Sequence, residues 1–201
     1  MLIVPLPTYI LDGLLVLNLL LSVATILVCM QITEPLEFSI FPTLLLVATL
    51  FRLGLDVSAT RMILLFGYVK DPVTKEATGA GHLIPAFGQV VVGGNLVVGV
   101  IMFLILIIIQ LIVITKGAER IAGVAARFTL DAMPLKLMAI EGELASGAVS
   151  QDKALAKREK VQQESDFFAS MDGAGKFVQG DAIAAIVIMA INILGGVVIG
   201  V

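Results

Sequence analysis

The sequence is poor in the side chains that most catalytic and metal sites use. Its 201 residues include one cysteine, one histidine and no tryptophan. Cys29 stands alone in an apolar run, which excludes an internal disulfide and leaves no thiolate cluster for a metal. His82 has no acidic or histidine cluster beside it in the sequence. We therefore expect its side chain to face solvent and to form neither a metal site nor a proton site.

The motifs of common enzymes are missing too. The sequence has no phosphate-binding P-loop, no GxGxxG fingerprint, no HExxH pair and no GxSxG elbow. We therefore expect a protein that is not an enzyme and has no cofactor, no metal and no nucleic-acid partner.

Charged residues are also scarce. They make up 14% of the sequence, hydrophobic residues make up 59%, and the mean hydropathy is +1.06. A soluble domain has about 25% charged and roughly 45–50% apolar residues. Runs of about 20 apolar residues are long enough to cross a hydrocarbon core of roughly 30 Å. The composition therefore predicts an all-α fold, that of a polytopic helical membrane protein.

Three apolar stretches precede residue 116. Residues 13–32 are uncharged and long enough for one span. Residues 38–69 form a second, longer run that contains charges. Residues 83–115 would be about 50 Å long as one helix, which exceeds one span. We therefore expect a break at Gly93-Gly94-Asn95, between a short interfacial or re-entrant piece and a full span that ends at Thr115.

A polar block, residues 116–181, separates these stretches from a last apolar run, residues 182–201. Most of the 13 Lys and Arg residues lie in this block. By the positive-inside rule the block is a cytoplasmic loop between the N-terminal membrane helices, residues 1–115, and a further span. Counting back through three spans then places residue 1 outside, so we expect one more span before it.

The polar block itself reads as two helices. The first begins near Lys116, and Pro134 should end or kink it. The second is amphipathic, follows Ser150 as a possible cap and covers about residues 151–171. The sequence Asp-Gly-Ala-Gly at residues 172–175 should break this second helix.

Three charged residues interrupt the second apolar run. Arg52 and Asp56 are four residues apart and share one helix face. Arg61 lies about 140° around the helix from Asp56, so its own helix offers no close acid. It either extends to an interface or has a functional partner on another element.

Several segments resemble one protein family. The stretch VITKGAERIAGVAARFTLDAMPLKLMAI, residues 113–140, resembles the signature of the FHIPEP family. Those proteins are the large export-gate components of flagellar and virulence type III secretion systems. Four further segments agree with the family in order, namely VPLPTYILD (4–12), FPTLLLVATLFRLGLDVSATR (41–61), AFGQVVVGGNLVVG (86–99) and ESDFFASMDGAGKFVQGDAIA (164–184).

The resemblance implies a bacterial inner-membrane, multi-pass protein with about eight spans and a large C-terminal cytosolic domain. The chain would then stop before the remaining spans and that domain. In the family, nine copies form a ring, and export of unfolded substrates is coupled to the proton motive force. Expected partners are other membrane proteins of the export apparatus, soluble export components and the exported proteins. Residues 129–133 and 55–58 favour the flagellar over the virulence system.

The resemblance also implies functional residues. Arg61, Lys176 and Asp181 match membrane-associated charges on which the family depends, and Asp131, Arg52 and Asp56 are further candidates for proton or charge coupling. The signature loop contributes Arg127, Phe128, Asp131, Pro134 and Lys136. Leu135 and Leu137 replace a usual glycine and a usual amide, so we expect the turn after Pro134 to differ from that of the family.

We hypothesise that Asp181 is a protonatable carboxylate at the cytoplasmic mouth and that Arg61 and Lys176 set its protonation. Simpler roles remain open, because Asp181 could cap the last span and Lys176 could only pair with Asp172 four residues earlier. Two other function classes remain open as well. One is a secondary transporter or channel with its site at the Gly93-Gly94 break. The other is a membrane anchor that only holds copies of the protein together.

Overall fold

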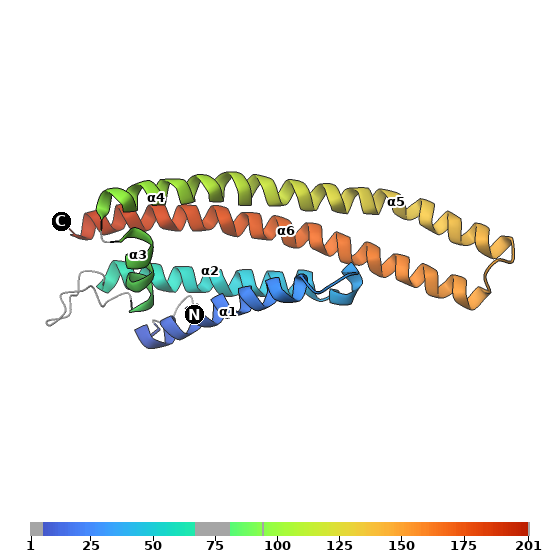
Figure 1. Cartoon of the computed structure of the whole chain (residues 1–201), viewed down its shortest axis with the longest axis horizontal. Helices are drawn as coiled ribbons and strands as arrows, with labels where there is room; N and C mark the ends of the chain where they lie inside the picture. Colours follow the sequence, from blue (N-terminus) through green and yellow to red (C-terminus); the bar gives the residue numbers. More distant parts are fainter. Residues whose placement is uncertain (1–5, 67–80, 94, 201) are drawn as a thin grey trace.

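The computed structural model describes residues 6–66, 81–93 and 95–200, and within these residues every regular element is helical (Figure 1). In chain order the elements are α1 (Thr8–Cys29), the 3-10 helix η1 (Pro35–Phe38), α2 (Phe41–Phe66), α3 (Leu83–Val92), α4 (Leu96–Ile109), the π-helical segment η2 (Gln110–Ala118), α5 (Glu119–Ala145) and α6 (Gln151–Gly200). The predicted all-α fold is confirmed. Residues 70–82 are polar and rich in glycine and threonine, which predicts a loop, and they lie outside the described residues except for Gly81 and His82.

Three helices are long and apolar enough to cross a membrane. They are α1, α2 with η1, and α6. The short helix α3 and the apolar helix after it (Val97–Val113) meet at an angle of 99°. If the two together form one broken span, the number of spans is four. Large apolar side chains are exposed along α1, α4 and the end of α6, as lipid-facing helices require. The chain is thus an all-α protein with three or four helices that are long and apolar enough to span a membrane.

The helix ends follow from local chemistry. Pro7 precedes α1 and Pro35 begins η1, where a missing N–H costs nothing. Gly93 ends α3 with a positive φ of 61°, a conformation that glycine adopts without strain. Asn95 then caps α4, because its Oδ1 accepts hydrogen bonds from the N–H groups of Val97 (3.0 Å) and Val98 (3.5 Å). The chain therefore turns where the sequence places a break.

Helix α6 is the axis of the fold (Figure 1). On one side it packs antiparallel to the rod formed by α4, η2 and α5, and on the other side it packs against α2. Contacts of Thr60 with Asn192 and of Glu34 with Lys160 show that α2 and α6 run in the same direction. The pair between Lys160 Nζ and Glu34 Oε2, at 3.0 Å, places the link before α2 beside the polar block.

At the end of the molecule away from the α5–α6 hairpin tip, Asp12 connects α1 to the start of α3. Its carboxylate accepts hydrogen bonds from the backbone N–H groups of His82 (2.9 Å) and Leu83 (3.3 Å). It therefore satisfies two free donors at the start of α3. The His82 side chain is exposed, as predicted. Between α1 and α2, the buried side chains of Leu11, Leu55 and Met62 form a small apolar core.

Two predicted helix ends are wrong. Pro134 lies inside α5, which continues to Ala145, so Pro134 does not end the helix and there is no turn after it for Leu135 and Leu137 to alter. Residues 172–175 lie inside α6, which continues to Gly200. Packing between the two helices outweighs these local preferences, since a helical glycine costs only about 1 kcal/mol. A Cβ on Gly175 would lie 3.7 Å from the Ala122 Cβ, so small residues let α6 approach α5 closely.

Candidate functional site

The charged residues inside the apolar helices meet where α2 packs on α6. Asp181 of α6 is 5% exposed, and its Oδ2 lies 4.0 Å from the Nη1 atom of Arg52 on α2. Arg52 Nε also lies 3.9 Å from Asp56 Oδ2, one helical turn further along α2. One guanidinium therefore lies between two carboxylates, and the group carries a formal charge of −1 when all three are ionised.

A second polar contact joins α2 and α6 further along the two helices. The Asn192 side-chain amide donates a 3.1 Å hydrogen bond to Thr60 Oγ1, which itself donates to the Asp56 carbonyl oxygen at 2.8 Å. The Asn192 Oδ1 atom is buried, and within the described residues it has no hydrogen-bond partner. We call this set of residues, Arg52, Asp56, Thr60, Asp181 and Asn192, the α2–α6 seam.

The seam lies along apolar helices. Arg52 is in the interior of α2, between apolar turns, and Asp181 directly precedes the uncharged run of α6, residues 182–200. Charges beside such runs are costly, so side chains there usually serve an ion or proton pathway or a specific pairing. The seam is therefore the strongest candidate for a functional site in the described residues.

The seam revises the roles given to three charges. Asp181 is in the interior of α6, so it does not cap a helix. Its nearby cation is Arg52, which takes the place that the sequence-based hypothesis gave to Arg61 and Lys176. Lys176 pairs with Asp172 at 2.7 Å. Arg61 lies nine residues beyond Arg52 on α2, about 14 Å further along the axis and beside Thr60.

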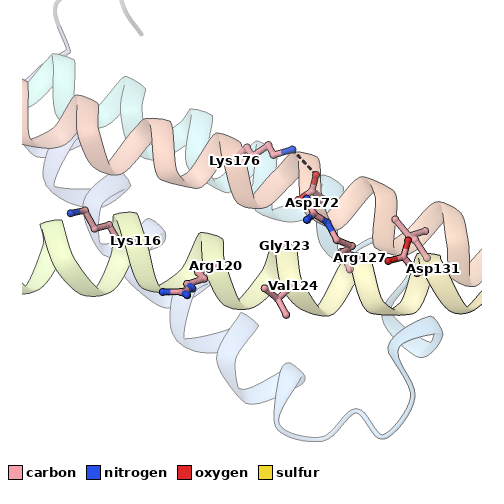
Figure 2. Close-up of a pocket in the computed structure, with 10 residues that line it drawn as sticks. Lys116, Arg120, Gly123, Val124, Arg127, Asp131, Asp172 and Lys176 are labelled. Atoms are coloured by element: carbon pink, nitrogen blue, oxygen red, sulfur yellow. Dashed lines mark hydrogen bonds and ion pairs between the residues drawn. The ribbon is translucent and has the colours of Figure 1, made fainter.

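The signature residues lie apart from the seam, on α5. A hollow of about 590 Å³ lies between the η2–α5 rod and α6, and Figure 2 shows the residues that line it. We call it the basic hollow, and its lining residues are Lys116, Arg120, Gly123, Val124, Ala126, Arg127, Leu130, Asp131, Asp172 and Lys176. It thus unites two signature residues, Arg127 and Asp131, with Lys176. Phe128 and Pro134 are exposed, and Lys136 binds Glu164 of α6 at 2.8 Å.

Four residues at these two sites were not singled out from the sequence. Thr60 follows Arg52 and Asp56 at four-residue intervals, which is the spacing of one helix face. Asn192 is a polar residue in an otherwise apolar run. Lys116 and Arg120 precede Arg127 by eleven and seven residues, again on one helix face. Helical spacing could have found Thr60, Lys116 and Arg120, and Asn192 could have been found as a polar residue in an apolar run.

Comparison with known proteins decides the family. The model of the FHIPEP family matches residues 1–201. The chain belongs to the FHIPEP family. It is 54% identical to the flagellar biosynthesis protein FlhA of Caulobacter vibrioides and 52% identical to that of Bacillus subtilis. It is 50% identical to the low calcium response locus protein D of Yersinia pestis.

Each alignment covers 100% of this FHIPEP chain, but only 28%, 28% and 27% of the respective relative. The chain thus spans little more than a quarter of the length of these relatives. No solved structure matches it.

Proposed function

We propose that this chain is a membrane part of a type III protein-export apparatus, of the flagellar more than the virulence kind. In this proposal it couples the proton motive force to the export of unfolded proteins. Its membership of the FHIPEP family and its 54% identity to a flagellar biosynthesis protein support this role. The proposed location is the bacterial inner membrane. The proposed assembly is a ring of copies, with other export components and substrates as partners, and the chain acts without an enzymatic step.

One observation carries the coupling role, namely the position of Asp181 against Arg52. With both carboxylates of the seam ionised, Asp181 and Asp56 share a single guanidinium. When Asp181 binds a proton, its ion pair with Arg52 is lost and the seam becomes formally neutral. The attraction that holds α6 on α2 at that level is then weaker, and α6 can shift relative to α2.

Helix α6 is suited to transmit such a shift. It is continuous for 50 residues from the hairpin tip to its apolar end, about 75 Å at 1.5 Å per residue. Lys136, Glu143 and Glu141 of α5 pair with Glu164, Lys157 and Arg158 of α6, so the two helices of the hairpin move together. Proton binding at Asp181 would thereby reposition the α5–α6 hairpin, where soluble export components bind in this proposal.

The test is Asp181→Asn in the intact protein, with proton flux and substrate export measured in the same cells. We expect both to fall to near background, because the amide cannot release a proton. Asp166→Asn is the matched control, since Asp166 is an exposed carboxylate of α6 that only accepts a bond from Gln162 at 2.9 Å. Wild-type values for both measurements in Asp181→Asn would remove Asp181 from the mechanism. Normal export after neutralising Arg61, Lys176 and Asp181 together would favour a plain membrane anchor.

A second candidate function rests on the bend between α3 and α4. A helix that starts inside a membrane directs its free N–H groups at a cavity, as in many secondary transporters. Here Asn95 occupies two of these donors. If the protein moves a small solute, Asn95→Ala should alter solute uptake into proteoliposomes that contain no export substrate. Unchanged uptake together with normal protein export would reject this candidate.

A further inference from the structure

The basic hollow has more positive charge than its own carboxylates neutralise. Four cations, Lys116, Arg120, Arg127 and Lys176, face two carboxylates, Asp131 and Asp172 (Figure 2). The formal charge of the hollow is thus 4 − 2, or +2. Lys176 and Asp172 neutralise each other at 2.7 Å. The remaining three cations are all on the η2–α5 rod, and among the described residues that line the hollow Asp131 is the one carboxylate left to balance them.

The donors of these three cations are free to bind a ligand. In the part of the chain that the structure describes, Lys116, Arg120 and Arg127 form no ion pair and no side-chain hydrogen bond. A guanidinium offers a planar set of N–H donors that matches the oxygens of a phosphate, and two such groups can hold one phosphate from two sides. An anion with one or two negative charges would bring the hollow close to neutrality.

The depth of the hollow identifies the source of that anion. The last uncharged run of α6 begins at residue 182 and continues to Gly200, about 28 Å, which is close to the thickness of one hydrocarbon core. Lys176 and Asp172 precede this run by six and ten residues, so they lie about 9–15 Å beyond its polar end. The hollow is therefore near the level of the lipid headgroups.

Apolar surface adjoins the hollow. Val113 is 57% exposed just before Lys116, and Ile121 and Val124 are 74% and 48% exposed on α5. A ligand with a phosphate at one end and acyl chains at the other fits this combination. We propose that the basic hollow binds a phosphate group carried by the headgroup of an anionic lipid. This inference does not depend on the export role.

The test uses the intact protein in nanodiscs with equal amounts of phosphatidylglycerol and phosphatidylcholine. Lipids retained after extraction are counted by native mass spectrometry. Each cation near a membrane surface strengthens anionic-lipid binding several-fold, so Arg120→Gln with Arg127→Gln should lower the preference for phosphatidylglycerol by about tenfold or more. The matched control is Lys153→Gln with Arg158→Gln, which removes the same charge about 30 Å away along α6 and should retain the preference.

A gain-of-binding variant separates the proposal from loss of folding. Asp131→Asn raises the formal charge of the hollow to +3, and Asp131 is exposed, so this variant should bind phosphatidylglycerol more tightly. Inorganic phosphate is the second probe. If phosphate binds the wild type but not the double arginine variant, while lipid retention is the same in both, the phosphate site stands and its ligand is a soluble anion. Equal binding of both probes by the wild type and the double arginine variant would overturn the proposal.

Discussion

Helix α6 forms two contacts of opposite character. Against α5 it makes three ion pairs, Lys136–Glu164, Lys157–Glu143 and Arg158–Glu141, all with side chains at least a quarter exposed. Against α2 it makes an ion pair with a side chain that is nearly buried, Asp181. The exposed ion pairs lie at the polar end of the molecule, and the nearly buried one lies beside the apolar end of α6.

The number of ion pairs is therefore a poor measure of what holds α6 in place. Exposed ion pairs contribute about 0–1 kcal/mol each, because water solvates the separated charges almost as well. Removing one partner of a buried pair is far more costly, because the remaining charge is then buried without a partner or water to stabilise it. We infer that the α5–α6 contact depends on close packing of small residues and that the α2–α6 contact depends on one arginine.

The largest effect should come from overpacking the α5–α6 contact. Ala126 of α5 is 2% exposed and lies beside the hollow between α5 and α6, so Ala126→Leu forces the two helices apart and should cost about 1–3 kcal/mol. Ala125→Leu is the control, because Ala125 is exposed on the same helix. Denaturant titration of the purified protein measures the difference. Equal stability of the two variants would mean that the hairpin does not depend on close approach at Ala126.

Removing Arg52 should come next. Arg52→Ala leaves the nearly buried Asp181 without its cation, but the Arg52 side chain is itself 50% exposed, so we expect a loss of only about 1–2 kcal/mol in the free energy of unfolding. The same denaturant titration applies. Adding Asp181→Asn to Arg52→Ala should recover part of the loss, because the isolated charge is then gone. A double variant that is less stable than Arg52→Ala alone would show that the pair is not the cause.

Much of the fold can be predicted from local sequence. Apolar length predicts the membrane helices, and Gly93 marks the turn between α3 and α4. Four-residue spacing is enough to anticipate the pairs Arg52–Asp56 and Lys176–Asp172. Each of these features depends on residues within one helix or one turn, which is the range that sequence patterns report.

Features that depend on packing between helices do not follow from local sequence. Pro134 and Gly173 would end isolated helices, but α5 and α6 stabilise each other through these points. The approach of Arg52 to Asp181 depends on how α2 is aligned with α6, and periodicity within either helix does not fix that alignment. The sequence alone does not decide whether Arg61 or Asp56 belongs to the functional site, because each is a charged residue in the same apolar run.

The smallest effect should come from the exposed ion pairs. Arg158 Nη2 lies 3.5 Å from Glu141 Oε1, with side chains 42% and 66% exposed, so Arg158→Ala should change the free energy of unfolding by no more than about 0.5 kcal/mol. Raising the salt concentration should reduce even this difference, because salt screens exposed charges most strongly. The cost of Arg52→Ala should fall by a smaller fraction in the same salt series, because Asp181 is nearly buried. If Arg158→Ala instead costs as much as Arg52→Ala, the hairpin is held by its ion pairs and the distinction between the two contacts of α6 fails.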